Sequence, residues 1–214
     1  MKSLLLGIVL IIAIGLGGLV YRNAVEHPSQ PIACPMDALM CPDGTAVSRT
    51  GSTCTFSQCL PPNVSLTDIG ISFAVPANFT VAELPDASSV ASYEMAIASS
   101  TEVSNIVIRR YALSASSTAL TTIQQTAIGG ASGLPVGTTS FTSVVLGARR
   151  FTVVSIERFE GVVDTAYYLA RGSDVLRFDA IDRGVMRWTD ATLTVSTLPA
   201  HSALTKLLST LQGQ

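Results

Sequence analysis

The stretch from Arg150 to Ile181 restricts the fold of this chain more than any other, because apolar and polar residues alternate through it in three runs. Two short polar links, Glu160-Gly161 and Arg171-Gly172-Ser173, separate the runs. Alternation with a period of two is typical of β-strands, and links of two or three residues join neighbouring antiparallel strands. The stretch therefore predicts a three-stranded antiparallel meander.

The two faces of this meander are expected to differ in polarity. Successive side chains of a strand point to opposite faces, so Leu176, Phe178 and Ala180 share one face. Arg177 and Asp179 then share the other face. We expect the first face to form core and the second to carry charged side chains.

Further runs rich in β-branched and aromatic residues predict strands at residues 69–75, 79–84, 93–98, 104–113, 139–146 and 191–197. Ser116-Ser117-Thr118 is a capping sequence for a helix that ends near Ala127. Pro199 begins a second helix, in which leucines recur on one face. For residues 63–214 this order predicts an α+β domain, with an antiparallel sheet covered by helices.

An early segment of this domain reads Gly70-Ile71-Ser72-Phe73-Ala74-Val75-Pro76, with Phe79 shortly after it. Together with the later helix, long meander and terminal helix, this segment resembles the PsbP/Mog1 type of domain. The resemblance implies a PsbP/Mog1-like fold. It also implies a non-enzymatic assembly or binding module, because members of that fold family act in this way.

Two pairs of adjacent arginines, Arg109-Arg110 and Arg149-Arg150, fall in or beside predicted strands. Neighbouring side chains of a strand point to opposite faces, so neither pair can form one basic patch. We expect these arginines to be solvated or paired with carboxylates across strands. With a formal net charge of -2 and no basic cluster, the sequence excludes nucleic acid from the expected partners.

A small aromatic and basic group is the candidate binding corner of the domain. Trp188 follows Arg183 and Arg187 in a turn-like segment, and Tyr168 is the fourth member of the hypothesis. The alternative is that Trp188 covers an edge of the sheet, which is the commoner role for such a residue.

Catalytic chemistry has little support in the sequence. The two histidines, His27 and His201, have no accompanying nucleophile motif. Phosphate-binding and calcium-binding loop motifs are also missing. We therefore expect no catalytic residue, no cofactor and no metal ligand.

An uncharged apolar run from Leu4 to Val20 follows Lys2 near the N-terminus. At about 1.5 Å per residue, a helix of this length, with Ser3 and Tyr21 at the interfaces, can just span a hydrocarbon core of roughly 30 Å. The run predicts a transmembrane signal anchor over residues 1–22, followed by a linker over residues 23–33. A cleaved signal peptide is the alternative. The body is thus expected outside the cytoplasm, held at the cell membrane by a single pass, or secreted if the N-terminus is cleaved.

Four cysteines, Cys34, Cys41, Cys54 and Cys59, lie close together beyond this run. An even number of cysteines in a turn-rich segment predicts a disulfide-stapled module, here over residues 34–60. A zinc site is the rival reading, but paired short spacings and a histidine are missing. Three pairings are open. Turn-forming residues favour Cys41 with Cys54 and Cys34 with Cys59.

The stretch Cys34-Pro35, followed by Cys41-Pro42-Asp43-Gly44-Thr45, resembles the opening of Kazal-type inhibitors and follistatin-like modules. The resemblance implies protease inhibition through residues 45–52. The chain departs from the Kazal pattern by having four cysteines rather than six. It also has Ala46 and Val47 where the family has an aromatic residue, which puts the inhibitory role in doubt.

These observations predict a membrane-anchored extracytoplasmic protein that is a non-enzymatic binding or structural module. Its partners would be the membrane, through the N-terminal helix, and a protein outside the cytoplasm. Two alternatives stay open. One is a Kazal-like protease inhibitor, and the other is an enzyme with an unrecognised site near His201 and Trp188.

Overall fold

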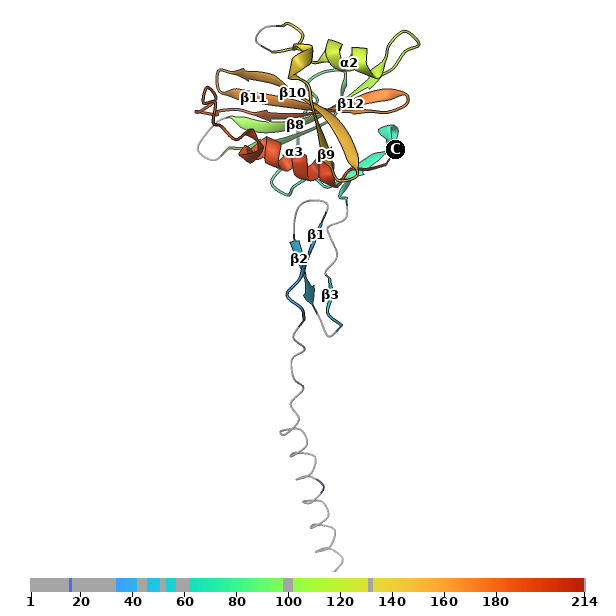
Figure 1. Ribbon diagram of the computed structural model, residues 1–214, viewed down its shortest axis with the longest axis vertical. Coiled ribbons are helices and arrows are strands. Elements are labelled where there is room, and N and C mark those ends of the chain that lie inside the picture. The colour runs from blue at the N-terminus through green and yellow to red at the C-terminus, as the bar shows by residue number, and fades with distance from the viewer. Residues whose placement is uncertain are drawn as a thin grey trace, which may run out of the picture. The chain divides into compact units, whose positions relative to one another are not determined.

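The computed structural model describes residue 16 and residues 34–41, 46–50, 53–56, 62–97, 102–130 and 133–213 (Figure 1). The chain divides into two compact units. One contains Met1–Leu39 and Ser48–Ser57, and the other contains Met40–Val47 and Gln58–Gln214. The large sheet domain of residues 62–213 and the small cysteine-linked sheet of residues 38–56 are described in turn.

The domain is built on a seven-stranded sheet in which every neighbouring pair of strands is antiparallel. In spatial order the strands are β6 (Thr80–Val81), β7 (Ser89–Ala96), β8 (Val103–Ala112), β12 (Asp174–Asp182), β11 (Val162–Ala170), β10 (Arg149–Phe159) and β9 (Thr142–Leu146). The predicted meander is confirmed as β10, β11 and β12. Its first turn has φ angles of 48° at Glu160 and 79° at Gly161, and positive values at both positions are typical of a tight hairpin turn.

A second, three-stranded sheet and two helices complete the domain. The sheet has the order β13 (Gln212–Gly213), β5 (Ile71–Phe73) and β4 (Val64–Leu66). The helices are α2 (Ala119–Thr126) and α3 (Pro199–Ser209). Three single turns of 3-10 helix are η1 (Thr67–Ile69), η2 (Thr138–Ser140) and η3 (Val195–Thr197).

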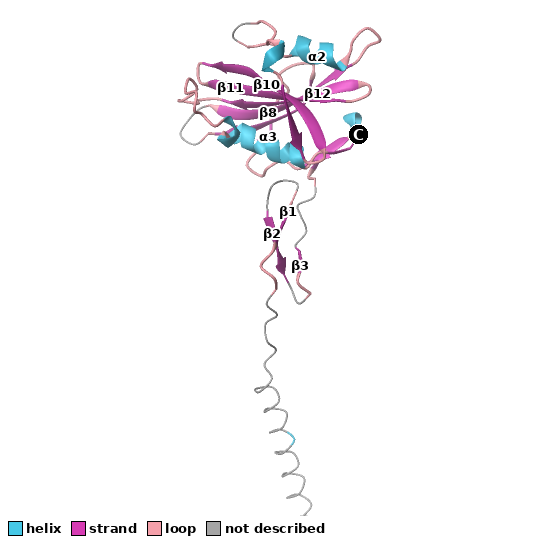
Figure 2. Ribbon diagram, viewed as in Figure 1, coloured by secondary structure: helices cyan, strands magenta, loops and turns pink. Residues whose placement is uncertain are grey.

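The two helices pack on opposite faces of the large sheet, as Figure 2 shows. The larger core lies between the sheet and α3, where Phe178 and Leu176 contact leucines of the helix. A smaller core lies under α2 and includes Ile123, Val154 and Tyr168. The predicted division of β12 into an apolar and a charged face is confirmed, since Arg177 and Asp179 lie on the α2 side.

The prediction of an α+β fold with a helix-covered sheet is wrong. The described residues form mainly antiparallel strands, and α2 and α3 have only eight and eleven residues. Such short helices leave much of the seven-stranded sheet without a helical cover. The strand expected at 191–197 is also wrong, because η3 occupies its end, and the one expected at 79–84 shortens to β6.

The predicted transmembrane segment falls almost wholly outside the described residues, which include only Leu16 from it. Among the residues that are described, no helix is both long and apolar enough to cross a membrane.

The small sheet contains β1 (Ala38–Met40), β2 (Ala46–Thr50) and β3 (Thr55–Phe56), in that order. A disulfide joins Cys34 to Cys54, with 5.3 Å between their Cα atoms. Cys41 is also disulfide-bonded, and Cys59 lies outside the described residues. A disulfide module is thus confirmed.

The favoured pairing of Cys41 with Cys54 and of Cys34 with Cys59 is wrong, because Cys34 bonds Cys54 instead. Arg49 lies in β2. The Arg49 guanidinium donates to both carboxylate oxygens of Asp37 and to the Cys54 carbonyl. The chain has a turn at residues 53–54 between β2 and β3, where Cys54 has a φ of 51°.

Candidate functional site

A groove of about 580 Å³ lies on the part of the sheet's α2 face that is formed by β7, β8 and β12. We call it the β8 groove. It is lined by Val81, Ala82, Glu83, Pro85, Ser92, Glu94, Asn105, Val107, Arg109, Ile181 and Arg183. The volume falls in the range of roughly 300–1,000 Å³ that is usual for ligand pockets.

Strand register explains why these side chains meet. Alternate residues of β8, namely Asn105, Val107 and Arg109, point to one face of the sheet. Asn105 lies opposite Ile181 of β12 on one side and opposite Glu94 of β7 on the other. The floor of the groove is therefore a short stretch of regular sheet, which holds its side chains in fixed positions.

Arg109 is held at one end of the groove by two carboxylates. It donates through Nε to Asp86 at 2.9 Å and through Nη1 to Asp179, which is fully buried. Burial would by itself raise the pKa of Asp86, but hydrogen bonds from Ser88 and Arg109 hold it well below its usual range. The guanidinium of Arg109 is thus fixed in position before any ligand arrives.

The series of ion pairs continues from Asp179 to Arg177, under α2. Arg177 donates to Asp179 at 2.7 Å and to the carbonyl of Thr126, the last residue of α2. Its guanidinium carbon also lies 5.7 Å from the centre of the Tyr168 ring. Helix α2 is therefore tied to the charged face of the sheet by a buried arginine.

Asp164 of β11 is the least satisfied member of this group. It is only 9% exposed, and its Oδ1 atom has no hydrogen-bond partner within the described residues. Burial, and then the negative charge of Asp179, raise the pKa of Asp164 well above its usual value. When Asp164 is neutral, Arg109 and Arg177 balance Asp86 and Asp179.

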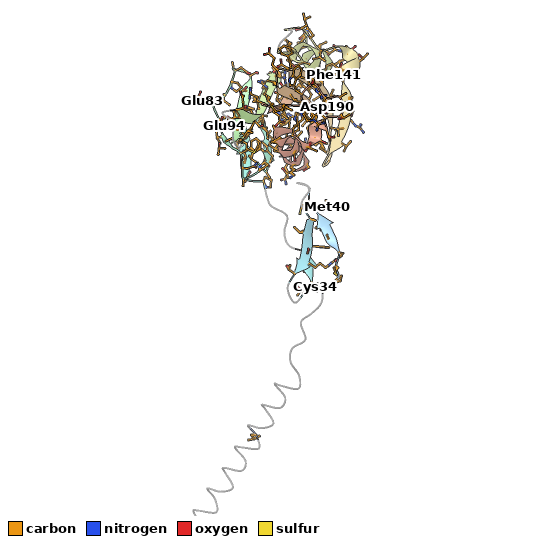
Figure 3. The ribbon with its side chains drawn as sticks, turned by 90° about the vertical axis from the view of Figure 1, so that its left-hand side faces the viewer. Cys34, Met40, Glu83, Glu94, Phe141 and Asp190 are labelled. Carbon is orange, nitrogen blue, oxygen red and sulfur yellow. A yellow bond between two sulfur atoms is a disulfide. The ribbon has the colours of Figure 1, made fainter. Side chains whose placement is uncertain are left out.

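The rest of the groove carries charges of both signs. Arg183 donates to the side-chain oxygen of Asn105 and to the Val103 carbonyl. The carboxylates of Glu83 and Glu94 make no hydrogen bond or ion pair in the described part of the chain. Figure 3 labels both and shows them on the same side of the domain. Val81 beside them is 82% exposed and adds an apolar rim.

The structure does not bring the four residues of the predicted binding corner together. Tyr168 is buried against α2, where its hydroxyl lies 3.4 Å from that of Thr126. Trp188 packs edge-to-face on Phe159 at the end of β10, with 5.8 Å between ring centres. Arg187 pairs with Asp190, and Arg183 lies at the β8 groove.

His201 is buried at the start of α3, on the opposite side of the sheet from the groove. Its Nδ1 lies 2.7 Å from Asp182, and its Nε2 has no partner among the described residues. Asp182 also accepts hydrogen bonds from the Ala200 amide and the Ser104 hydroxyl. These contacts join α3 to the sheet.

The sequence predicted one contact of the groove but not the groove itself. The expectation that Arg109 and Arg110 point to opposite faces is confirmed, and of the two expected roles, solvation or pairing across strands, both arginines pair, with Asp179 and Asp174 of β12. The roles of Glu94 and Asn105 were missed, because only their register beside Val107 shows that they share a groove. Asp86 was missed as well, since it lies in a loop.

Comparisons with known proteins give no family. No protein-family model matches the sequence, and no curated protein matches it significantly. Among solved structures, a crystal structure from Bacteroides thetaiotaomicron VPI-5482 is similar, with 12% sequence identity and a TM-score of 0.40. The match covers 67% of this chain and 45% of that one.

Proposed function

We propose that this chain is a non-enzymatic binding module that acts outside the cytoplasm through the β8 groove. The observation that carries the proposal is the groove itself, in which a pre-positioned guanidinium, Arg109, and unpaired carboxylates are among the lining residues. Groups fixed before binding lose little conformational entropy on association, which favours recognition.

The ligand that fits this groove best is an extended polypeptide segment with both acidic and basic side chains. From Asn105 to Arg109 the floor follows one strand for roughly 13 Å, the length of about four extended residues. Arg109 and Arg183 suit carboxylates, while Glu83 and Glu94 suit ammonium or guanidinium groups. The exposed Val81 offers an apolar contact beside them.

Binding without turnover is supported by the chemistry of the lining. Its guanidinium groups stay charged at all physiological pH values and cannot exchange protons as a general base does. Its two free carboxylates, Glu83 and Glu94, have no nucleophile hydrogen-bonded to them in the described part of the chain. Ser92 supplies a hydroxyl, but no histidine or carboxylate accepts its proton in the described part of the chain. An alternative active site near His201 gains little support, because that side chain is 1% exposed.

The extracytoplasmic location is supported by the oxidised cysteines, since such bonds persist in oxidising compartments. Attachment to a membrane through residues 1–22 stays a prediction. Protease inhibition through residues 45–52 also stays a hypothesis. Its described part, Ala46–Thr50, is the central strand of the small sheet rather than a free loop.

The test is selection of peptides from a random displayed library on the oxidised full-length chain. We expect enriched peptides to carry both charges. Arg183→Glu should lower the frequency of acidic residues at one end of the enriched sequences, and Glu94→Lys should lower that of basic residues. Recovered peptides should be intact by mass spectrometry.

The control is Arg150→Glu, which reverses an exposed charge on β10, outside the groove. It should leave the selected sequences as they are in the native chain. The proposal is abandoned if no sequence is enriched, or if all three variants select the same peptides. Cleaved peptides would instead indicate an enzyme.

A further inference from the structure

A second cleft, of about 500 Å³, lies where β8 ends beside the turn between β11 and β12. Its lining includes Asp68, Arg110, Arg171, Gly172, Ser173 and Asp174. Because Arg109 and Arg110 are neighbours in a strand, their side chains point to opposite faces of the sheet. The cleft is therefore separate from the β8 groove, and we call it the Arg110 cleft.

One buried carboxylate organises the cleft. Asp174 is fully buried, and both of its oxygens accept hydrogen bonds from Arg171, at 2.6 Å each. One of the same oxygens also accepts from Nε of Arg110 at 2.7 Å. Two guanidinium groups thus share one carboxylate, which leaves this group of three side chains with a surplus positive charge.

The surplus charge is accessible at Arg110. Its side chain is 39% exposed, and its two terminal nitrogens have no hydrogen-bond partner within the described residues. Arg171, in contrast, is 15% exposed and also donates to the Ile69 carbonyl. Arg110 is therefore oriented through Nε while the other side of its guanidinium stays available, and that geometry suits two parallel bonds to one oxyanion.

Backbone donors lie at the same cleft. The amides of Gly172 and Ser173, in the turn between β11 and β12, make no hydrogen bond in the described part of the chain. A Cβ atom placed on Gly172 would meet nothing within 4 Å, so there is open space beside this turn. Asp68 is the one exposed carboxylate in the lining, and no ion pair neutralises it in the described part.

We propose that the Arg110 cleft binds an oxyanionic group, a phosphate or a carboxylate, through the terminal nitrogens of Arg110 and the amides of Gly172 and Ser173. Asp174 and Arg171 act as positioning residues that hold Arg110 in place. Asp68 weakens binding, because its carboxylate carries the same charge as the oxyanion.

The test is titration of the oxidised full-length chain with inorganic phosphate and, separately, with acetate, at constant ionic strength set with chloride. Amide resonances of Gly172 and Ser173 are followed by NMR. We expect saturable shifts with at least one of the two anions. Saturation with phosphate alone identifies a phosphoryl ligand, and saturation with acetate alone identifies a carboxylate.

Variants separate a binding role from a structural one. Arg110→Gln should weaken binding by about 10-fold or more, since it removes a charged two-bond contact. Asp68→Asn should strengthen it by about two- to five-fold, because an exposed like charge is removed. Gly172→Leu should block the open space and abolish binding without unfolding the domain. Arg150→Gln, which changes a residue outside the cleft lining, should change nothing.

The proposal is overturned if neither anion gives saturable shifts in the native chain. It is equally overturned if Arg110→Gln and Arg150→Gln bind the anion with the same affinity while both remain folded. The outcome does not depend on the β8 groove, because none of these substitutions changes a residue that lines it.

Discussion

Asp164 lowers the stability of this fold, because its carboxyl group is buried and one of its oxygens lacks a hydrogen-bond partner in the described structure. The raised pKa reflects this burial and the nearby charge of Asp179. A carboxyl whose pKa is raised by folding contributes stability below the unfolded value of about 4, and that contribution is lost as pH rises through the folded pKa.

Asp164→Asn should therefore stabilise the domain at neutral pH. The amide resembles the neutral acid in shape and never ionises, so we expect a gain of roughly 1–3 kcal/mol in the free energy of unfolding near pH 7. Urea unfolding at several pH values measures it. The gain should shrink toward pH 4. A difference between the two proteins that does not vary with pH would contradict the assigned role of ionisation.

At the residue scale, strand periodicity predicts much of this chemistry. The alternation around Arg177 and Asp179 placed both on one face, and the structure agrees. The unpartnered oxygen of Asp164 could not be predicted, because it depends on which side chains β10, β12 and α2 bring near it. Likewise, the sharing of Asp174 by Arg110 and Arg171 depends on register between β8 and β12.

The N-terminus of helix α3 is capped by a residue from another element of the domain. Leu198 precedes Pro199 at its start and provides no side-chain cap. Asp182, at the end of β12, accepts hydrogen bonds from the amides of Ala200 and His201 instead. The cap comes from a residue of β12 rather than from the residue that precedes the helix. The sequence therefore predicted that the helix begins at Pro199, but it could not predict which residue accepts hydrogen bonds from its first amides.

Asp182→Asn should destabilise the domain by about 1–3 kcal/mol at neutral pH, because an amide cannot accept from all four donors around it. Burial alone would raise the pKa of Asp182, but hydrogen bonds from His201 and the Ala200 amide lower it below its usual value. The stability gained is present above the unfolded pKa of about 4 and is lost as pH falls through the folded pKa.

Chemical denaturation at neutral and acidic pH measures this effect. The loss should be largest near neutrality and should disappear in acid. Asp68→Asn is the control, since that carboxylate is exposed in η1, and it should change stability by less than about 0.5 kcal/mol. An equal loss in both variants would contradict the capping role.

The turn between β9 and β10 gives a second prediction at the scale of elements. Gly147 has a φ of 58°, and a Cβ there would lie 2.6 Å from the backbone oxygen of Ser209 at the end of α3. The left-handed conformation alone costs an alanine roughly 1–2 kcal/mol, and the clash adds to it. Gly147→Ala should therefore lower the thermal unfolding midpoint.

Gly172→Ala is the matched control, because its Cβ would meet nothing within 4 Å and its φ is not in the left-handed region. It should leave the midpoint nearly unchanged. If both variants melt at the same temperature, the contact between the β9–β10 turn and α3 does not contribute to stability in the way the structure implies.

The positions of long elements were easier to predict than the fold class. The meander and both helices lie close to where periodicity placed them. The prediction of a helix-covered sheet failed because periodicity gives no measure of how wide a sheet becomes. Pairing of β8 with β12 and of β7 with β8 widens the sheet to seven strands, well beyond the reach of α2 and α3.

At the scale of the whole molecule, the two sheets are stabilised by different means. The domain buries two hydrophobic cores and contains no cysteine. In the small sheet, Cys41 is the only buried residue among the described residues from 34 to 56. The contacts described for the small sheet include the Cys34–Cys54 disulfide, the Arg49–Asp37 ion pair and the stacking of Arg49 on Phe56.

Reduction should consequently unfold the small sheet and leave the domain folded. A bridge across a sequence separation of 20 residues restricts the unfolded chain by about 3 kcal/mol, which is more than one exposed ion pair supplies. Hydrogen exchange of the full-length chain, with and without a thiol reductant, measures both parts at once. Amides of β2 should lose protection, while those of β8, β11 and β12 should keep it. If the amides of β12 exchange faster after reduction, the stability of the domain depends on the cysteine-linked sheet, and the two must be treated as one folding unit.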